Sequence, residues 1–130
     1  MHCVGEYPTI HDHLQMNQIT QLKERYPGVP VGFSTHEDPG NYEAVFVAVG
    51  KGAQLFEKHV AVVTDQYPKN AYSSTPDQVK EWLRSASRAL SMCGKVNERH
   101  ENSEKEIADL RRFKRAVFCK KKNKKRGNYR

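Results

Sequence analysis

Apolar and polar positions along the chain change period several times, and the changes predict strands and helices in turn. Three short, mostly apolar runs predict strands at 1–4, 29–33 and 53–57. Apolar residues that recur at helical spacing predict helices at 13–25, 41–50 and 76–93. The alternation therefore predicts three strand-loop-helix units in series.

Residues that start and stop helices mark the ends of these segments. Pro27 and Gly28 end the first helix, and Asn41 can cap the second. Pro76 suits the first turn of the third helix, with possible caps at 73–75, and Gly94 ends it. The predicted fold class is therefore α/β, with a parallel sheet, right-handed crossovers and functional loops where the strands end.

The remaining residues predict a polar linker and, after it, one more short strand. Residues 95–110 are polar and prone to form a helix, with a helix-start pattern at 103–106. One more short strand is predicted at 116–119, just before a lysine-rich end.

The charge of the chain lies mostly in that end. The 130 residues carry a net charge of +7, but residues 111–130 hold 11 Lys and Arg and no acid. The other 110 residues hold 11 basic and 15 acidic side chains, a net of −4. A terminal lysine run with little aromatic interleaving is typical of a solvated tail, so nucleic acid is not an expected partner. A basic-tail module that binds anions or nucleic acid through 120–126 is an alternative interpretation.

The sequence has the features neither of a membrane-spanning protein nor of a disulfide-stabilised one. No run of about 18 apolar residues is present, and the first residues lack a secretory signal, so no membrane partner is expected. The three cysteines, at positions 3, 93 and 119, are odd in number and widely spaced. We therefore expect a reducing cytoplasm rather than a disulfide framework.

Polar side chains that could bind a metal ion or take part in catalysis follow each predicted strand. Residues two apart on a strand face the same side, so Ser34 projects with His36, and Glu57 with His59. Neighbouring strands lie about 4.8 Å apart, so the two imidazoles can share one ion. Two histidines suit an open metal site rather than a structural zinc site; the alternative is two ordinary loop histidines. By the same alternation, residues 3, 5 and 7 line the neighbouring position.

Several of these segments, in this order, resemble the N-acetylneuraminate (sialic acid) synthase family. They are His2-Cys3-Val4-Gly5-Glu6-Tyr7-Pro8-Thr9, Val31-Gly32-Phe33-Ser34-Thr35-His36, Phe56-Glu57-Lys58-His59, and Tyr72-Ser73 with Pro76-Asp77. The resemblance covers nearly the whole chain. It implies a partial TIM (β/α)8 barrel, about the last three βα units, over 1–94. A linker at 95–112 and the truncated start of an antifreeze-like (SAF) domain with a basic tail at 113–130 would follow.

The resemblance also implies a function. The family condenses phosphoenolpyruvate with an N-acylated hexosamine such as N-acetylmannosamine to a nine-carbon sugar acid, and it works as a homodimer. His36 and His59 match ligands of a manganese or magnesium ion. Ser34 matches a residue that contacts phosphoenolpyruvate. Tyr7 and Glu57 match residues near the sugar, where Glu57 can orient the sugar or a water.

Some positions depart from the family pattern. Thr35 replaces the Asp of a Ser-Asp-His sequence, and residues 67–70 replace a Gly-Pro-Asp. These departures lie on the sugar side, so the metal and phosphoenolpyruvate interpretation is the firmer one. The chain starts at the strand that the family places sixth of eight, so we expect it to be inactive alone and to associate. Two further alternatives are another phosphoenolpyruvate-dependent aldol-type synthase and a non-catalytic remnant.

Overall fold

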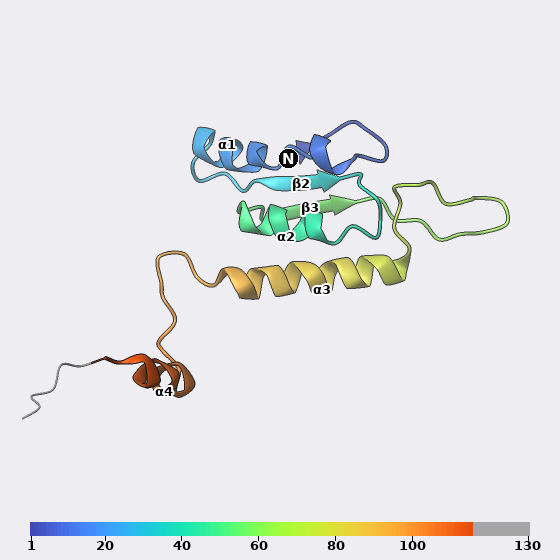
Figure 1. Cartoon of the computed structure of the whole chain (residues 1–130). Helices are drawn as coiled ribbons and strands as arrows, with labels where there is room; N and C mark the ends of the chain where they lie inside the picture. Colours follow the sequence, from blue (N-terminus) through green and yellow to red (C-terminus); the bar gives the residue numbers. More distant parts are fainter. Residues whose placement is uncertain (116–130) are drawn as a thin grey trace, which may run out of the picture. The chain divides into compact units, whose positions relative to one another are not determined.

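The computed structural model describes residues 1–115, in which a small parallel sheet is followed and covered by helices. The strands are β1 (His2–Cys3), β2 (Gly32–Thr35) and β3 (Leu55–Lys58), in the spatial order β1-β2-β3 with both pairs parallel. The helices that follow them are α1 (Asn17–Arg25), α2 (Glu43–Gly50) and α3 (Pro76–Cys93). In Figure 1 the arrows of β2 and β3 lie side by side and point toward the long loop that leads into α3. The predicted α/β class and the three strand-loop-helix units are confirmed.

Two apolar clusters hold the helices on one face of the sheet. The first joins Ile19 of α1 and Phe33 of β2 to Ala48 of α2. The second joins α2 to α3 through Val45 and Trp82, among others. Phe56 of β3 packs against both clusters. Residues 33 and 56 are a register pair, so this row of the sheet faces the helices.

Several predicted element boundaries need correction. The strands predicted at 1–4 and 53–57 span His2–Cys3 and Leu55–Lys58, and the helix predicted from residue 41 begins at Glu43. The strand predicted at 29–33 begins only at Gly32, because Pro30 has no amide hydrogen to donate to a ladder. The helix predicted from residue 13 begins at Asn17, because Gln15 has a φ of 48°, in the left-handed region. A short 3₁₀ helix, His11–His13, precedes α1.

Helix ends follow the predicted signals closely. Thr75 and Gln78 form a capping box: the Thr75 hydroxyl accepts from the Gln78 amide at 3.3 Å, and the Gln78 side chain accepts from the Thr75 amide at 2.9 Å. Gly94 ends α3 with a φ of 66°. The predicted cap Asn41 lies one residue before the N-cap position of α2, which is Tyr42, but its side chain still accepts a hydrogen bond from the Ala44 amide at 3.3 Å.

A second compact unit starts at Asn97, after the unit of residues 1–96. It contains α4 (Glu104–Phe113), which starts at Ser103, whose hydroxyl accepts from the Glu106 amide at 3.1 Å. The predicted helix start at 103–106 is therefore confirmed. The predicted strand at 116–119 and the basic end of the predicted domain at 113–130 lie outside the described residues. Within residues 1–115, no helix is long and apolar enough to cross a membrane.

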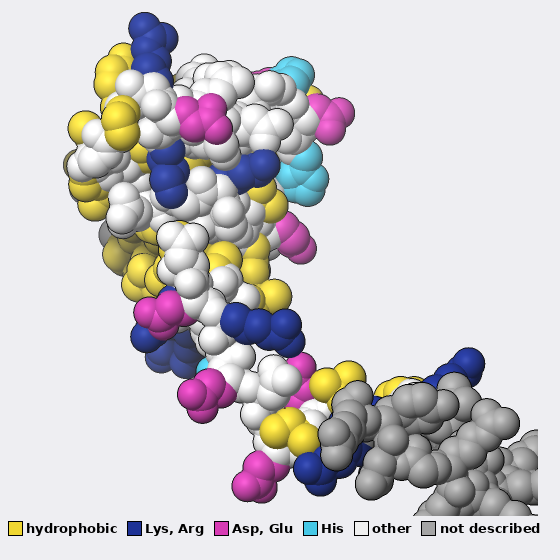
Figure 2. Space-filling model, turned by 90° about the vertical axis from the view of Figure 1, so that its left-hand side faces the viewer, with side chains coloured by type: hydrophobic (Ala, Val, Ile, Leu, Met, Phe, Trp, Pro, Cys, Tyr) yellow, Lys and Arg dark blue, Asp and Glu magenta, His cyan; other side chains and the backbone are white. Residues whose placement is uncertain are grey.

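The unit of residues 1–96 exposes apolar side chains away from its two clusters. Figure 2 shows hydrophobic side chains gathered along one side of this unit. Leu55 on β3 is 52% exposed, and Leu83 and Leu90 on α3 are 54% and 58% exposed. Apolar surface on this scale is unusual for a self-sufficient small domain.

Candidate functional site

The strand ends bring one row of polar side chains together on the sheet face opposite the apolar clusters. Cys3 pairs in register with Ser34, which pairs with Glu57. The buried Ser34 hydroxyl donates a hydrogen bond to Glu57 Oε1 at 2.9 Å. The other carboxylate edge of Glu57 remains available because that side chain is exposed. Ser34 and Glu57, each predicted to project with a histidine, therefore also contact each other directly.

The two histidines lie two residues beyond this row, on the same face: His36 follows Ser34, and His59 follows Glu57. The His36 and His59 ring centroids lie 5.1 Å apart with planes at 45°. His36 is buried, with 4% of its surface exposed, whereas His59 is exposed. The structure thus brings the two predicted imidazoles side by side.

The hydrogen bonding of His36 determines which of its nitrogens is available. His36 Nδ1 lies 2.9 Å from the carbonyl oxygen of Val4. A carbonyl can only accept, so Nδ1 carries the hydrogen and donates it. In the neutral ring, Nε2 therefore keeps a free lone pair, which is how metal-binding histidines are usually oriented. Cys3 Sγ lies 4.0 Å from the same Nδ1.

Two tyrosines enclose the histidine pair. The Tyr7 ring lies 4.4 Å from the His36 ring and 5.0 Å from the Tyr72 ring, centroid to centroid. Tyr72 also meets His59 edge-on, with 5.1 Å between the centroids and planes at 88°. Tyr7 was predicted in this site from the sequence.

Tyr72 was not predicted as a site residue, because it lies far along a loop with no periodic pattern. Its position depends on a backbone pairing in which the Ser74 amide donates to the His59 carbonyl at 2.9 Å. The Asn70 side chain adds two bonds, accepting from the amides of Tyr72 at 3.2 Å and Ser73 at 2.7 Å. The signals that could have indicated it were the turn-forming Asn70, two residues before it, and the place of Tyr72-Ser73 in the family resemblance.

The donor set fits an open divalent-metal site. Within residues 1–115, no group of three or more His, Cys, Asp or Glu side chains is arranged to hold a metal ion. Two neighbouring imidazoles, with the Nε2 lone pair of His36 free, are donors that such an open site would use, with oxygens of water or a substrate at its other positions.

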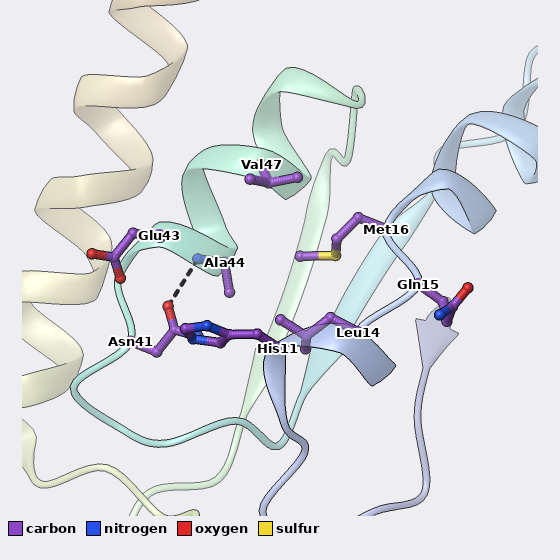
Figure 3. Close-up of a pocket in the computed structure, with 8 residues that line it drawn as sticks. All are labelled: His11, Leu14, Gln15, Met16, Asn41, Glu43, Ala44 and Val47. Atoms are coloured by element: carbon purple, nitrogen blue, oxygen red, sulfur yellow. Dashed lines mark hydrogen bonds between the residues drawn. The ribbon is translucent and has the colours of Figure 1, made fainter.

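A separate cavity of about 250 Å³ lies away from this cluster, between the His11–His13 turn and α2 (Figure 3). In Figure 3 the His11 ring lies beside Asn41, whose side-chain oxygen accepts from the Ala44 amide. Leu14, Met16 and Val47 supply most of its apolar lining. None of the predicted site residues lines it, so the candidate site remains at the strand ends.

Comparison with known proteins gives consistent matches. Residues 1–98 match the model of the NeuB family. A solved protein from Chromobacterium violaceum, assigned as spore coat polysaccharide biosynthesis protein E, is 51% identical with a TM-score of 0.77 over 85% of this chain. The N-acetylneuraminic acid (sialic acid) synthetase of Leptospira borgpetersenii, solved with citrate, is 27% identical with a TM-score of 0.70, also over 85%.

A curated relative extends these matches. The spore coat polysaccharide biosynthesis protein SpsE of Bacillus subtilis is 33% identical over 84 residues, 64% of this chain. This chain spans only 22% of that protein, and 33% and 38% of the two solved chains. The similarity therefore concerns one part of longer relatives.

Proposed function

This chain belongs to the NeuB family, and we propose that it carries part of a synthase site that condenses phosphoenolpyruvate with an N-acylated hexosamine such as N-acetylmannosamine. The observation that carries the proposal is the pairing of His36 and His59, 5.1 Å apart, beside the Ser34–Glu57 hydrogen bond. These groups lie where adjacent parallel strands end, which is where (β/α) barrels hold their catalytic residues. The names of the Leptospira and Bacillus relatives support sugar-acid or polysaccharide chemistry.

We propose that the three βα units belong to a (β/α)8 barrel. The strands are parallel and consecutive in space, and the helices lie on one face, as in a barrel segment. The site face of the sheet would then point into the barrel. Because the chain spans 38% or less of the relatives compared above, the remaining barrel units, the homodimer and the antifreeze-like domain are part of this proposal.

His36 and His59 are the proposed ligands of a manganese or magnesium ion. The hydrogen bond from His36 Nδ1 to the Val4 carbonyl leaves Nε2 free for that role. Such an ion, when bound, would supply Lewis acidity to the aldehyde oxygen of the open-chain sugar.

The proposed reaction forms one carbon–carbon bond and replaces the carbon–oxygen bond to phosphate with a carbon–oxygen bond from water. Carbon 3 of phosphoenolpyruvate bonds to the aldehyde carbon, and the aldehyde oxygen takes the electron pair and a proton. Water then adds at carbon 2 and loses a proton. The bond from carbon 2 to the phosphate oxygen then breaks, phosphate leaves with the electron pair and takes up the proton of the new carbon 2 hydroxyl, and a ketone remains.

Ser34 and Glu57 have complementary proposed roles in this chemistry. The Ser34 hydroxyl has one hydrogen, which Glu57 accepts in this structure. Ser34 can donate to phosphoenolpyruvate only by rotating away from Glu57. That rotation would leave the Glu57 carboxylate free to accept a proton or hydrogen bond from the sugar or from water.

Tyr7 is the proposed sugar contact. The residue is 54% exposed although its ring lies against both His36 and Tyr72. A half-exposed aromatic ring can cover the apolar face of a sugar while its hydroxyl bonds to a polar group. Tyr72 extends the same aromatic wall over His59.

Manganese titration of the chain tests the metal site. Free Mn²⁺ measured by electron paramagnetic resonance should fall as wild-type protein is added. His36→Ala and His59→Ala should each weaken binding by at least tenfold, because each removes one of two protein ligands. His100→Ala, in the second unit, is the matched control and should bind as wild type does. Equal affinity in all four proteins would refute the metal assignment.

A chimera tests the reaction. Residues 1–98 would replace the matching segment of the Leptospira synthetase. Phosphate release from phosphoenolpyruvate should require both Mn²⁺ and N-acetylmannosamine, and should be lost in the His36→Ala chimera. A folded, manganese-binding chimera that releases no phosphate with any N-acylated hexosamine would overturn the proposed function.

A further inference from the structure

The two strands that carry the histidines separate directly after their last paired residues. The ladder between β2 and β3 ends at the register pair Thr35 and Lys58. Beyond it, the His36 carbonyl accepts from the Thr9 amide at 3.0 Å, on the β1 side. The His59 carbonyl accepts from the Ser74 amide at 2.9 Å, in the opposite direction. The two histidine backbones are therefore held by different neighbours.

One ion pair crosses the gap where the strands separate. Lys58 Nζ lies 3.0 Å from Glu37 Oε1. The two side chains are only 3% and 0% exposed. Glu37 directly follows His36, and Lys58 directly precedes His59. The pair therefore joins the two histidine segments through their nearest neighbours in sequence.

This ion pair lies on the sheet face opposite the site. Residues 35 and 37 alternate with Ser34 and His36, and Lys58 alternates with Glu57 and His59. Lys58 Nζ lies 5.8 Å from the centre of the Trp82 ring, on the side that α3 covers. The Ser34–Glu57 hydrogen bond joins the same strands on the site face. The ends of β2 and β3 are thus joined by side chains on both faces.

Burial makes the ion pair a poor way to gain stability alone. Removing two charges from water has a large desolvation cost, and apolar side chains of similar volume often stabilise a core as well or better. Glu37 Oε2 and Thr35 Oγ1 are buried and, within the described residues, have no hydrogen-bond partner, which adds to that cost. A geometric role explains why charged groups occupy this position.

We propose that Glu37 and Lys58 are positioning residues that hold His36 and His59 at the separation needed to share one metal ion. The inference rests on the proposed function. Without the ion pair, the backbone of the His36 segment is held through its hydrogen bond with Thr9, and that of the His59 segment through its hydrogen bond with Ser74, so the two segments can move independently. The imidazole separation is then less restricted, and both nitrogens meet one ion less often.

Two double variants of the chain separate positioning from packing. Glu37→Leu with Lys58→Met replaces both charges by apolar groups of similar size. Thr35→Asp with Glu37→Thr moves the carboxylate to the residue directly opposite Lys58 in the register. Glu81→Leu with Arg84→Met removes an exposed ion pair of 3.2 Å on α3 and serves as the matched control.

Three measurements apply to each variant: thermal unfolding, Mn²⁺ affinity by electron paramagnetic resonance, and nuclear Overhauser contacts between the His36 and His59 rings without metal. The apolar variant should unfold near the wild-type temperature but bind Mn²⁺ about 10- to 100-fold more weakly, the range found for groups behind metal ligands. Its contacts between the two rings should weaken. The relocated carboxylate should keep Mn²⁺ affinity within roughly threefold of wild type, because the ion pair re-forms. The control should match wild type.

The outcomes separate this inference from the proposed function. Wild-type Mn²⁺ affinity and ring contacts in the apolar variant would overturn the positioning role. If that variant does not fold, the relocated carboxylate decides: a loss of tenfold or more in affinity there would overturn it too. If wild-type protein binds no Mn²⁺, the proposed metal site fails. The ring contacts alone then test whether Glu37 and Lys58 position the two imidazoles: weaker contacts in the apolar variant support the role, and unchanged contacts overturn it.

Discussion

Neighbouring residues at the end of β2 face opposite environments. Ser34 and His36 face the site, whereas Thr35 and Glu37 face the helices, so the expectation that the Thr35 departure lies on the sugar side is wrong. The alternation follows from strand geometry, so the sequence alone predicted which residues would project together. The sequence did not predict the tautomer of His36, because that depends on a carbonyl 32 residues away.

Asn70 determines where Tyr72 lies, and its replacement should release that ring. Asn70→Ala removes the acceptor for the amides of Tyr72 and Ser73. We expect amide hydrogen exchange at Ser73 to accelerate by roughly fivefold, since a hydrogen bond of this kind contributes about 1 kcal/mol. Asp38→Ala, which removes a similar bond to the Gly40 amide at 2.8 Å, should change only its own loop. Unchanged exchange at Ser73 in Asn70→Ala would contradict the role of this turn.

Single elements show why boundary predictions succeeded at some places and failed at others. The ends of α3 were predictable because Thr75, Pro76 and Gly94 act on their own neighbours in the chain. The start of β2 was not predictable from its apolar run, because pairing with other strands decides where a ladder begins. Val31, although apolar and buried, precedes the strand and accepts from the Gln54 amide at 2.7 Å.

The capping box of α3 should contribute measurably to stability. Thr75→Ala removes the acceptor for the Gln78 amide and should lower the free energy of unfolding by about 1 kcal/mol. Ser87→Ala is a matched control in the same helix, because the Ser87 hydroxyl bonds only to its own helix, at the Leu83 carbonyl. Alanine also favours a helix interior, so Ser87→Ala should be neutral or slightly stabilising. Chemical denaturation of both variants checks the difference, and equal midpoints would argue against the cap.

The whole molecule combines a buried core with an apolar surface that its own elements leave exposed. The core lies between the helices and one sheet face, whereas Leu55, Leu83 and Leu90 are more than half exposed. Leu83 and Leu90 are seven residues apart and so share one face of α3. Such a face is a natural contact surface for other protein.

Self-association through α3 is the expected consequence. The wild-type chain should sediment as larger species as its concentration rises. Leu83→Lys with Leu90→Lys should weaken association by at least about tenfold, because burying either lysine would remove a charge from water. Val62→Lys with Val63→Lys is the control, since these residues are exposed at 69% and 61% on the loop before α3. Identical sedimentation of wild type and the α3 variant would rule out this face.

The sequence by itself determined the alternation of strands and helices, the caps of α3 and the residues that leave each strand together. These features depend on residues close in sequence, where periodicity and turn chemistry act directly. Only the tertiary structure decided that Tyr72 covers the two histidines and that Glu37 meets Lys58. Those contacts join residues 13 to 36 positions apart. Their existence depends on where the strands separate and how the loop after β3 returns, which no local pattern specifies.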